Sequence, residues 1–462
     1  MTKSYRPYNP QQQFLLPPSL QDWVPEDHLA RFVSDVVESL DLSVIHTDYA
    51  RKDARGTSPY HPSMMVKLLV YGYCVGVRSS RRIERATFDD VAFRFLAADQ
   101  HPDHASIAEF RRRHLEALAD LFAQVLRLCQ KAGLVKLGHV SLDGTKVKAN
   151  ASKHKAMSYD RMVESEKKLQ EEVRRLLEDA ETTDGDEDAR YGKDRRGDEL
   201  PAELRRRESR LKKIQEAKAA LEQEAREKAE RAAEEARAKN EERERKREAG
   251  KRVGRPFEVP NPAEAKPDPK AQRNFTDPDS RIMLDGATKS FVQAYNAQAV
   301  VDGTSQVIVA ADITQQAVDS RQLIPMLVRV AENLGVMPKT VTADAGYYSE
   351  ANVTAPLLAG IDLHIPPNQR EESKAQAGGQ GRPKSPVAIA MRVKLGTEAG
   401  KAIYKLRKAI VEPVFGQIKD ARGIRCILLR GLAKARAEWR LICLAHNLLK
   451  LFRATGAPTC PA

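Results

Sequence analysis

Val341-Thr342-Ala343-Asp344-Ala345-Gly346 closes an apolar, β-type run with an aspartate followed closely by a glycine. Ser141-Leu142-Asp143-Gly144-Thr145 shows the same arrangement much earlier in the chain. An aspartate at the end of a buried strand presents its carboxylate at the end of a sheet, and a neighbouring glycine leaves backbone room beside it. The two stretches therefore predict two strand ends, each presenting one carboxylate.

Val411-Glu412-Pro413-Val414-Phe415 supplies a third acidic residue, this time within a helical pattern. Carboxylates that converge from distant segments suit Mg²⁺, which is held by one or two protein carboxylates plus substrate phosphate. Two such cations about 3.5–4 Å apart stabilise both the attacking and the leaving oxygen of a phosphoryl transfer. Asp143, Asp344 and Glu412 together thus predict a site that cuts or joins nucleic-acid strands. Taken singly, an Asp-Gly pair is commonly a turn, and Glu412 would suit the helix N-terminus that Pro413 begins.

Longer stretches around these acids resemble the bacterial insertion-sequence transposases of the DDE type, and the resemblance runs from about Leu15 to Leu451. The matching stretches are Asp143-Gly144-Thr145-Lys146 with Ala149-Asn150-Ala151-Ser152-Lys153-His154-Lys155 behind it, Tyr295-Asn296-Ala297-Gln298, Ala343-Asp344-Ala345-Gly346-Tyr347, and residues 404–419. The resemblance implies an RNase H-like catalytic domain in which Asp143, Asp344 and Glu412 are the catalytic and metal-binding residues. The implied cofactor is Mg²⁺, with Mn²⁺ as a substitute.

The activity implied by the resemblance has three parts. The protein would bind the terminal inverted repeats of its element, cleave a strand at each end, and transfer the freed 3′-OH to target DNA. DNA is then the partner, and we expect a homo-oligomer on it. Two other classes stay open at this point: an RNase H-like nuclease without strand transfer, and an inactive DNA-binding coiled-coil assembly protein.

The family's Tyr, Arg, Glu, Lys signature is present with one change in spacing. It falls on Tyr404, Arg407, Glu412 and Lys419, with four rather than three residues between the second and third members. At about 100° per residue, Lys408 shares a helix face with Tyr404 and Glu412, whereas Arg407 points elsewhere. We therefore expect Lys419, Tyr404 and either Arg407 or Lys408 to contact DNA phosphates.

Charge and composition agree with a polyanion partner. The formal net charge is +13 and the isoelectric point is near 9.4, which is typical of proteins whose Lys and Arg neutralise phosphates. The five cysteines show neither CxxC nor Cys/His spacing, so they predict reduced thiols and no zinc site. A signal peptide and a long apolar run are both missing from the sequence, so we expect a cytoplasmic protein with no membrane span.

Residues 1–134 predict a helical N-terminal DNA-binding domain. Short helical patterns joined by polar turns, with arginines such as Arg81 and Arg82 near their ends, suit a helix-turn-helix module. A helical dimerisation bundle with solvated arginines is the alternative.

The remaining chain predicts an α/β protein: an RNase H-like mixed sheet interrupted by a helical coiled-coil insertion. Residues 135–157 hold the first strand, 158–272 the insertion with a Pro-rich linker, 273–455 the rest of the catalytic domain, and 456–462 a tail. The insertion shows an apolar seam at three, four and seven residue steps, which is typical of two antiparallel helices. Its members are Met162, Leu169, Val173 and Leu176 in one half, and Leu204, Leu211, Ile214 and Leu221 in the other.

Beyond the linker the pattern alternates between strands and helices. We expect strands at 291–301, 306–313, 340–343 and 361–365, a helix at 319–334, and a loop without regular structure at 369–399. The Asp302-Gly303 pair predicts a hairpin turn between the first two of these strands.

Overall fold

The computed structural model describes residues 19–50, 58–191, 202–250, 253–286, 288–367 and 385–455. The chain forms two compact units, one of Met1–Val147 with Tyr295–Ala462 and one of Lys148–Ala294. The second unit is thus inserted in the sequence of the first. The domain boundaries predicted from the sequence stay predictions, and the predicted tail at 456–462 lies outside the described residues.

The N-terminal part of the first unit is helical, as the sequence predicts. Its helices are α1 (Leu20–Trp23), α2 (Leu29–Ser39), α3 (Ser43–Ala50), α4 (Pro62–Val75), α5 (Ser80–Asp89), α6 (Val91–Leu96), α7 (His104–Arg113) and α8 (Leu115–Lys131). α4 starts with Pro62, whose missing N–H costs nothing in a first turn. It ends at Gly76, where φ is 78° and a Cβ would lie 2.4 Å from the Arg422 carbonyl oxygen. Only glycine suits that position.

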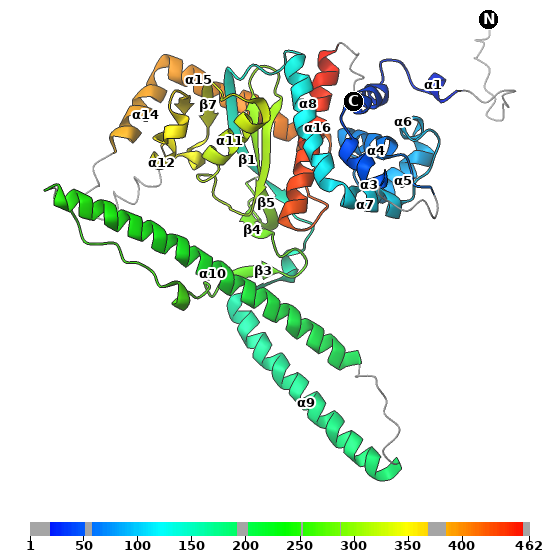
Figure 1. Ribbon diagram of the computed structural model, residues 1–462, viewed down its shortest axis with the longest axis vertical. Coiled ribbons are helices and arrows are strands. Elements are labelled where there is room, and N and C mark those ends of the chain that lie inside the picture. Colours follow the sequence, from blue (N-terminus) through cyan, green and yellow to red (C-terminus); the bar gives the residue numbers. More distant parts are fainter. Residues whose placement is uncertain are drawn as a thin grey trace, which may run out of the picture. The chain divides into compact units, whose positions relative to one another are not determined.

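A mixed sheet follows the helical part (Figure 1). Its strands in the first unit are β1 (His139–Lys148), β5 (Phe291–Asp302), β6 (Ile308–Thr314), β7 (Thr340–Ala343) and β8 (Asp362–His364), although the ends of β1 and β5 extend into the second unit. β5, β1, β7 and β8 are neighbours in that order, and β6 pairs with β5 on its other side. β1 is parallel to β7, and β7 to β8, whereas β5 and β6 form an antiparallel hairpin across the predicted turn. The predicted strands are confirmed to within about two residues.

Helices cover this sheet and bury its side chains. α11 (Leu323–Leu334) and α16 (Leu432–Ala454) pack against β6, while α15 (Glu398–Gly416) packs against β7 and β8. Val140, Leu142 and Val341 are fully buried. Burial of each such side chain stabilises the fold by about 1.5–3 kcal/mol. The core thereby fixes the strand ends that carry the predicted acids.

α16 also packs against α8 and α4 of the helical part. A buried ion pair lies at this contact, with Arg78 Nη1 3.1 Å from Glu438 Oε1. The other oxygen of Glu438 accepts the backbone N–H groups of Leu428 and Leu429, each at 2.9 Å. The helices before residue 134 and the sheet after it therefore share one core.

The second unit contains two long helices, α9 (Tyr159–Tyr191) and α10 (Ala202–Glu248), which lie side by side over part of their length (Figure 1). A short antiparallel ladder, β2 (Ala156–Ser158) with β3 (Gln272–Asn274), closes their base. β4 (Arg281–Leu284) pairs with the first residues of β5 in the same unit. Four seam residues are buried together, namely Met162, Leu169, Ile214 and Leu221. The side chains of Leu176 and Leu204 lie outside the described residues.

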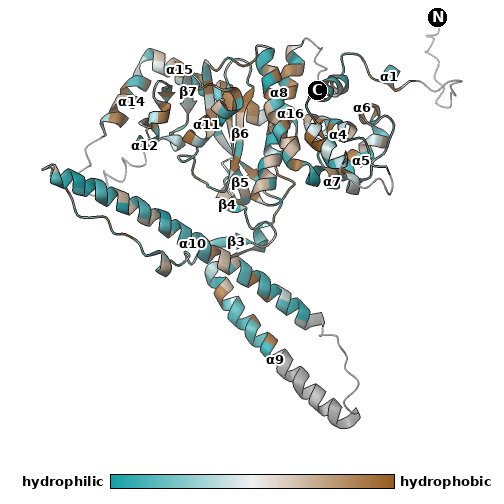
Figure 2. Cartoon of the chain, in the orientation of Figure 1, coloured by the Kyte–Doolittle hydropathy of each residue, from teal (hydrophilic) through white to brown (hydrophobic). Residues whose placement is uncertain are grey.

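α10 continues beyond this seam as a mostly hydrophilic helix, in contrast to the apolar strands β5 and β6 (Figure 2). The segment that follows it returns along the helix, and Asn240 bonds both backbone groups of Phe257, accepting from its N–H at 2.7 Å and donating to its C=O at 2.9 Å. A polar helix is thus tied to the returning chain by hydrogen bonds rather than by an apolar core.

One expectation from the sequence is wrong. Part of the segment expected to lack regular structure at 369–399 forms α14 (Pro386–Gly396) and the first turn of α15. Pro386 sits in the first turn of α14, where proline favours helix formation. Residues 368–384 lie outside the described residues. Among the helices that are described, none has the length and apolar character needed to cross a membrane.

Candidate active site

Two of the predicted acids lie on neighbouring parallel strands. The register of β1 with β7 pairs Leu142 with Ala343. Asp143 and Asp344 come directly after this pair, so their side chains emerge on the same side of the sheet where β7 ends. The negative charge of Asp344 contributes to the raised pKa of Asp143. The structure therefore brings these two acids together.

Asp143 is largely buried, with 18% of its side chain exposed. It accepts the backbone N–H of Gly144 at 2.8 Å and lies 3.0 Å from Arg407 Nη1. Burial raises the pKa of Asp143 to about 6, against the lowering effect of Arg407. One arginine thus does not fully offset the cost of a charged carboxylate here.

Asp344 begins the short turn after β7, where its Oδ1 accepts the N–H of Gly346 at 2.8 Å. Burial raises the pKa of Asp344, and the charge of Asp319 raises it further, while Arg407 and Lys146 lower it. Both acids therefore carry charge that the surrounding cations only partly compensate.

Asp319 is a third carboxylate at this site, and the sequence patterns did not single it out. It lies between β6 and α11, where its Oδ1 accepts Asn296 Nδ2 at 2.6 Å and Gln298 Nε2 at 2.8 Å. Its charge raises the pKa of both Asp143 and Asp344. The stretch Tyr295-Asn296-Ala297-Gln298 offered the signal, because two buried amides on one face of a strand need polar partners.

Gly144 shows how closely these groups pack. A Cβ at this position would lie 2.4 Å from Gln298 Nε2 and 3.0 Å from Asp319 Oδ1. Only glycine lets the backbone after Asp143 approach the amides that hold Asp319.

Basic and aromatic side chains from α15 and from the helical turn that follows it, Gln417–Ala421, complete the arrangement. The guanidinium of Arg407 lies 6.0 Å from the centre of the Tyr404 ring and lowers the pKa of both acids. Burial raises the pKa of Tyr404, and the charges of Asp344 and Asp143 raise it further. Lys419 donates to Thr145 Oγ1 and, at 2.9 Å, to the carbonyl oxygen of Lys146. Of the predicted DNA-contacting residues, Tyr404 and Arg407 therefore lie close to the two acids. Lys419 contacts β1, the strand that carries Asp143.

Lys408 and Glu412 are placed differently. Both are exposed on α15, and the side chain of Glu412 makes no hydrogen bond or ion pair with any residue in the described ranges. Five positions after Arg407, a helical residue points about 140° away from it. Since Arg407 faces Asp143, the structure does not bring Glu412 directly to Asp143 or Asp344.

Pro413 does not end α15, which continues to Gly416. A proline within a helix leaves the carbonyl four residues earlier without its usual donor. That carbonyl belongs to Ala409, and Gln306 Nε2 donates to it at 2.9 Å. The side chain of Gln306 thus replaces the hydrogen bond that Pro413 cannot make.

Arg81 and Arg82 lie on α5, and both are exposed. Neither forms an ion pair with the described residues. In contrast, Arg85 on the same helix pairs with Asp89 at 2.9 Å. Arg81 and Arg82 are therefore available to an external anion.

The acids fit Mg²⁺ in donor type and charge. All are carboxylates, which hard cations prefer, and Asp143 and Asp344 carry raised pKa values that a bound cation would lower. As they are placed, no three His, Cys, Asp or Glu side chains within the described ranges are grouped closely enough to hold a metal ion. Asp143 and Asp344 would therefore hold Mg²⁺ as a pair, together with oxygens of a bound phosphate.

Comparison with known proteins gives two family matches. Residues 18–113 match the family described as a transposase domain (DUF772), and residues 269–448 match the transposase DDE domain. The second match includes Asp319, Asp344 and Glu412 and begins after Asp143, beyond most of the second unit. Neither a curated protein nor a solved structure matches the chain.

Proposed function

Because the chain is an insertion-sequence transposase of the DDE type, we propose that it binds the terminal inverted repeats of its element. It then cuts a strand at each end and joins the freed 3′-OH to target DNA. The observation that carries this proposal is the pairing of Asp143 and Asp344 on neighbouring parallel strands. Two partly buried carboxylates with raised pKa values, flanked by cations, suit a site for phosphoryl transfer.

The strand order supports the RNase H-like fold implied by the resemblance. Numbered along the chain without β4, the strands of the first unit run third, second, first, fourth, fifth across the sheet. The first strand is thereby central and presents Asp143 beside the fourth, which presents Asp344. The buried seam of α9 and α10 supports our proposal that these helices form a coiled-coil insertion.

Asp143, Asp344 and Glu412 are the residues we propose to hold two Mg²⁺, with Mn²⁺ as a substitute. Bound metal would supply polarisation of the scissile phosphate and activation of water. Glu412 would have to turn or shift from its exposed position to take part, and Asp319 is the carboxylate already beside the other two.

The cations around the acids suit the negative charge of DNA. Lys419 donates to Thr145 and to the backbone of Lys146, so its ammonium group is held at β1, two to three residues along the strand from Asp143. Arg407 is paired with Asp143 and would be released for a phosphate once that carboxylate is compensated by metal. Tyr404 and Lys408 are further proposed contacts, Lys408 from the exposed side of α15.

The proposed reaction has two balanced steps. Water attacks a phosphorus at the end of the element, the P–O3′ bond breaks, and a 3′-OH and a 5′-phosphate result. This 3′-OH then attacks a phosphorus of target DNA, forming a new P–O bond as another P–O3′ bond breaks. Because two ends must be processed together, we also propose a homo-oligomer on the DNA, acting in the cytoplasm.

The test is a paired measurement on Asp344→Asn. This change removes an anionic metal ligand with little change in volume, so Mg²⁺-dependent nicking of terminal-repeat DNA should fall by at least about 10²-fold while binding persists. Strand-transfer products on a target plasmid separate a transposase from a nuclease. Nicking by Asp344→Asn at the parental rate would remove the chemical basis of the proposal.

Glu412→Gln and Asp319→Asn, measured in the same assay, test the third carboxylate. A large loss with Glu412→Gln and a small one with Asp319→Asn supports Glu412. The reverse result means that the assignment of Glu412 is wrong and that the acid held by Asn296 and Gln298 takes its place.

A further inference from the structure

A cavity of about 610 Å³ lies at the base of the helical hairpin, entirely within the second unit. It is lined by three segments: the turn before β2 with the first residues of β2, one face of α10, and the residues after β3. The lining residues are His154, Lys155, Ala156, Met157, Arg206, Ser209, Arg210, Lys213, Ile214, Phe275 and Thr276. Four of these carry a positive charge, one is a histidine and none is acidic. We call this set the basic pocket.

The cations of the basic pocket have no acidic partners in the part of the chain that the structure describes. Arg206, Arg210 and Lys213 make no ion pair with any described residue, and neither does Lys155. Elsewhere in the unit cations are paired: Arg207 with Glu172 at 3.1 Å, Lys218 with Glu166 at 2.8 Å, and Arg273 with Glu224 at 2.6 Å. Four cations without an ion-pair partner among the described residues therefore line one cavity, although several neighbouring cations of the unit are paired.

The turn that presents His154 and Lys155 is held by hydrogen bonds. Asn274 Nδ2 donates to the carbonyl oxygen of Ser152 at 2.7 Å, and the N–H of Phe275 donates to that of Lys155 at 3.0 Å. Ser152 Oγ accepts the N–H of His154 at 3.3 Å. The side chains of a fixed turn lose less entropy on binding a ligand than those of a free loop.

The α10 side of the pocket is equally regular. Arg206, Arg210 and Lys213 are spaced by four and three residues, so they share one helix face. Ile214 beside them is buried in the seam with α9, which fixes that face. These three cations extend over about 10 Å of helix, and duplex DNA carries a phosphate about every 3.4 Å along each strand.

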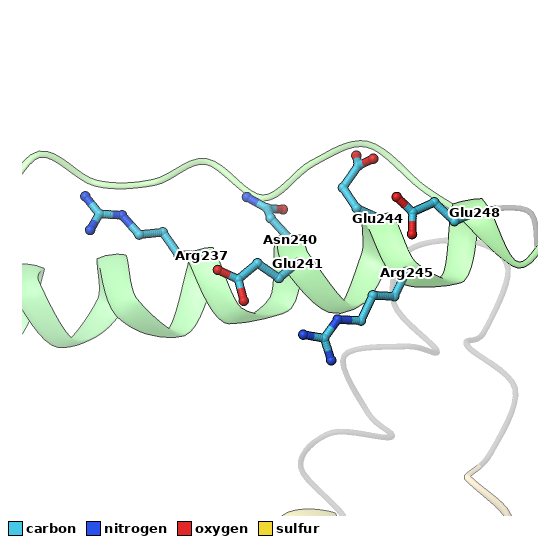
Figure 3. Close-up of a pocket in the computed structure, with 6 residues that line it drawn as sticks. All are labelled: Arg237, Asn240, Glu241, Glu244, Arg245 and Glu248. Atoms are coloured by element: carbon cyan, nitrogen blue, oxygen red, sulfur yellow. The ribbon is translucent and has the colours of Figure 1, made fainter.

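A second cavity on the same helix has a different charge balance. It is lined by Arg237, Asn240, Glu241, Glu244, Arg245 and Glu248, where three glutamates outnumber two arginines (Figure 3). A polyanion would be repelled there as much as attracted.

We infer that the basic pocket binds the phosphodiester backbone of DNA without reading its sequence. The cations would neutralise successive phosphates, and the hydroxyls of Ser209 and Thr276 suit hydrogen bonds to phosphate oxygens. The inference gives a role to the stretch 149–155, which the catalytic residues do not use. It depends on the proposed function only for the identity of the ligand as DNA.

The test compares two double variants of the full-length protein. Arg210→Ala with Lys213→Ala removes two cations of the pocket. Lys212→Ala with Lys228→Ala removes two exposed cations of α10 that do not line the pocket and that pair with no described residue. Binding of terminal-repeat duplex and of unrelated duplex is measured over a salt series.

The pocket variant should bind both duplexes about 10- to 100-fold more weakly than the parent near 0.1 M salt, with a salt slope lower by about one to two units. The control variant should bind within about twofold of the parent. Arg210→Lys with Lys213→Arg keeps the charges and should restore binding, which excludes misfolding as the cause. Equal binding by the pocket and control variants overturns the inference.

Two further measurements separate the possible outcomes. At constant ionic strength, inorganic phosphate should displace no more DNA from the protein than chloride does. If phosphate displaces more DNA than chloride from the parent but not from the pocket variant, the pocket is a site for small phosphates and the DNA assignment is overturned. On saturating DNA the pocket variant should nick like the parent if the parent nicks. A parent that binds through the pocket but never nicks contradicts the proposed function and leaves this inference standing.

Discussion

At the scale of single residues, Asp143 makes a stability prediction. Its pKa in the folded chain is raised to about 6 from the ordinary 3.8, mainly by burial. A raised carboxyl pKa means that its protonated form stabilises the fold below about pH 4, and that this stability is lost as pH rises through about 6. Asp143→Asn has no titrating carboxyl group at this position. As the pH rises from about 4 to about 6, the unfolding free energy of the variant should therefore increase relative to that of the parent by up to about 3 kcal/mol.

Urea unfolding with EDTA, at acid and neutral pH, measures this gain. Glu412→Gln is the control, because Glu412 is exposed and without partners among the described residues, and it should show no gain. Adding Mg²⁺ at neutral pH should stabilise the parent and not Asp143→Asn. A constant difference across pH would show that burial does not tune this acid.

Asp319 makes a second prediction from its hydrogen bonds. Asn296 and Gln298 are fully buried, and both donate to Asp319 Oδ1. Asp319→Ala leaves these donors without that acceptor, so the unfolding free energy should fall by about 2–4 kcal/mol. Glu332→Ala, at an exposed position of α11, is the control. A decrease no greater than that of the control would mean that water replaces the carboxylate fully.

Part of the site could be predicted from the sequence, and there is a physical reason why the rest could not. Asp143 and Asp344 were found because each follows a β-type run, a local pattern that fixes where a strand ends. The choice between Arg407 and Lys408 required knowing which face of α15 meets β1, and that depends on tertiary packing. Asp319 was not predicted because its hydrogen-bond donors, the side-chain amides of Asn296 and Gln298, lie on β5, and the sequence does not show that these segments lie together in the fold.

At the scale of elements, the structure at the base of α9 and α10 predicts that both helices can be deleted while the rest of the chain still folds. Ser158 on β2 faces Gln272 on β3, and the N–H of Tyr159 donates to the carbonyl oxygen of Ala271 at 2.8 Å. Replacing residues 160–270 with Asn-Gly would turn this ladder into a β-hairpin, since that pair favours the tight turn such strands need.

The shortened chain should stay soluble and unfold cooperatively, with a thermal midpoint close to that of the parent and a smaller helical signal in circular dichroism. The physical reason is that the buried residues of the seam between α9 and α10, Met162, Leu169, Ile214 and Leu221, are all removed together by the deletion. Replacing 160–270 with Pro-Pro, which opposes the turn, serves as the matched control. Aggregation of the Asn-Gly chain under all conditions would show that the hairpin is required for folding.

Regular elements were predictable where one periodicity dominates a stretch. The strands β5 to β8 and the helices of the hairpin follow apolar patterns that are evident in the sequence. α14 was missed because the Gly- and Gln-rich residues before it hid a helix that starts only at Pro386. Long-range pairings, such as that of Gln306 with the carbonyl of Ala409, leave no local pattern at all.

At the scale of the whole molecule, the helical part before residue 134 and the sheet share a core through α16. The Arg78 and Glu438 ion pair and the packing of α4 and α8 on α16 join segments from the two ends of the chain. Binding of DNA by α5 and chemistry at Asp143 would thus occur in one compact unit, which makes them separable by mutation rather than by cutting the chain.

The last prediction tests that division of labour with Arg81 and Arg82. Both are exposed on α5 and unpaired with the described residues, so Arg81→Ala with Arg82→Ala should weaken binding of terminal-repeat DNA. The salt slope should fall by about one unit for each phosphate that the variant no longer neutralises.

Arg85→Ala with Arg112→Ala is the matched control, since Asp89 and Glu109 already pair with these arginines and exposed pairs leave less charge for DNA. Nicking on saturating DNA should survive both changes, because neither touches Asp143 or Asp344. If both double variants lose binding equally, net charge alone attracts the DNA; if Arg81→Ala with Arg82→Ala binds like the parent, α5 is not the DNA-binding face, and the helical part is better explained as a dimerisation bundle.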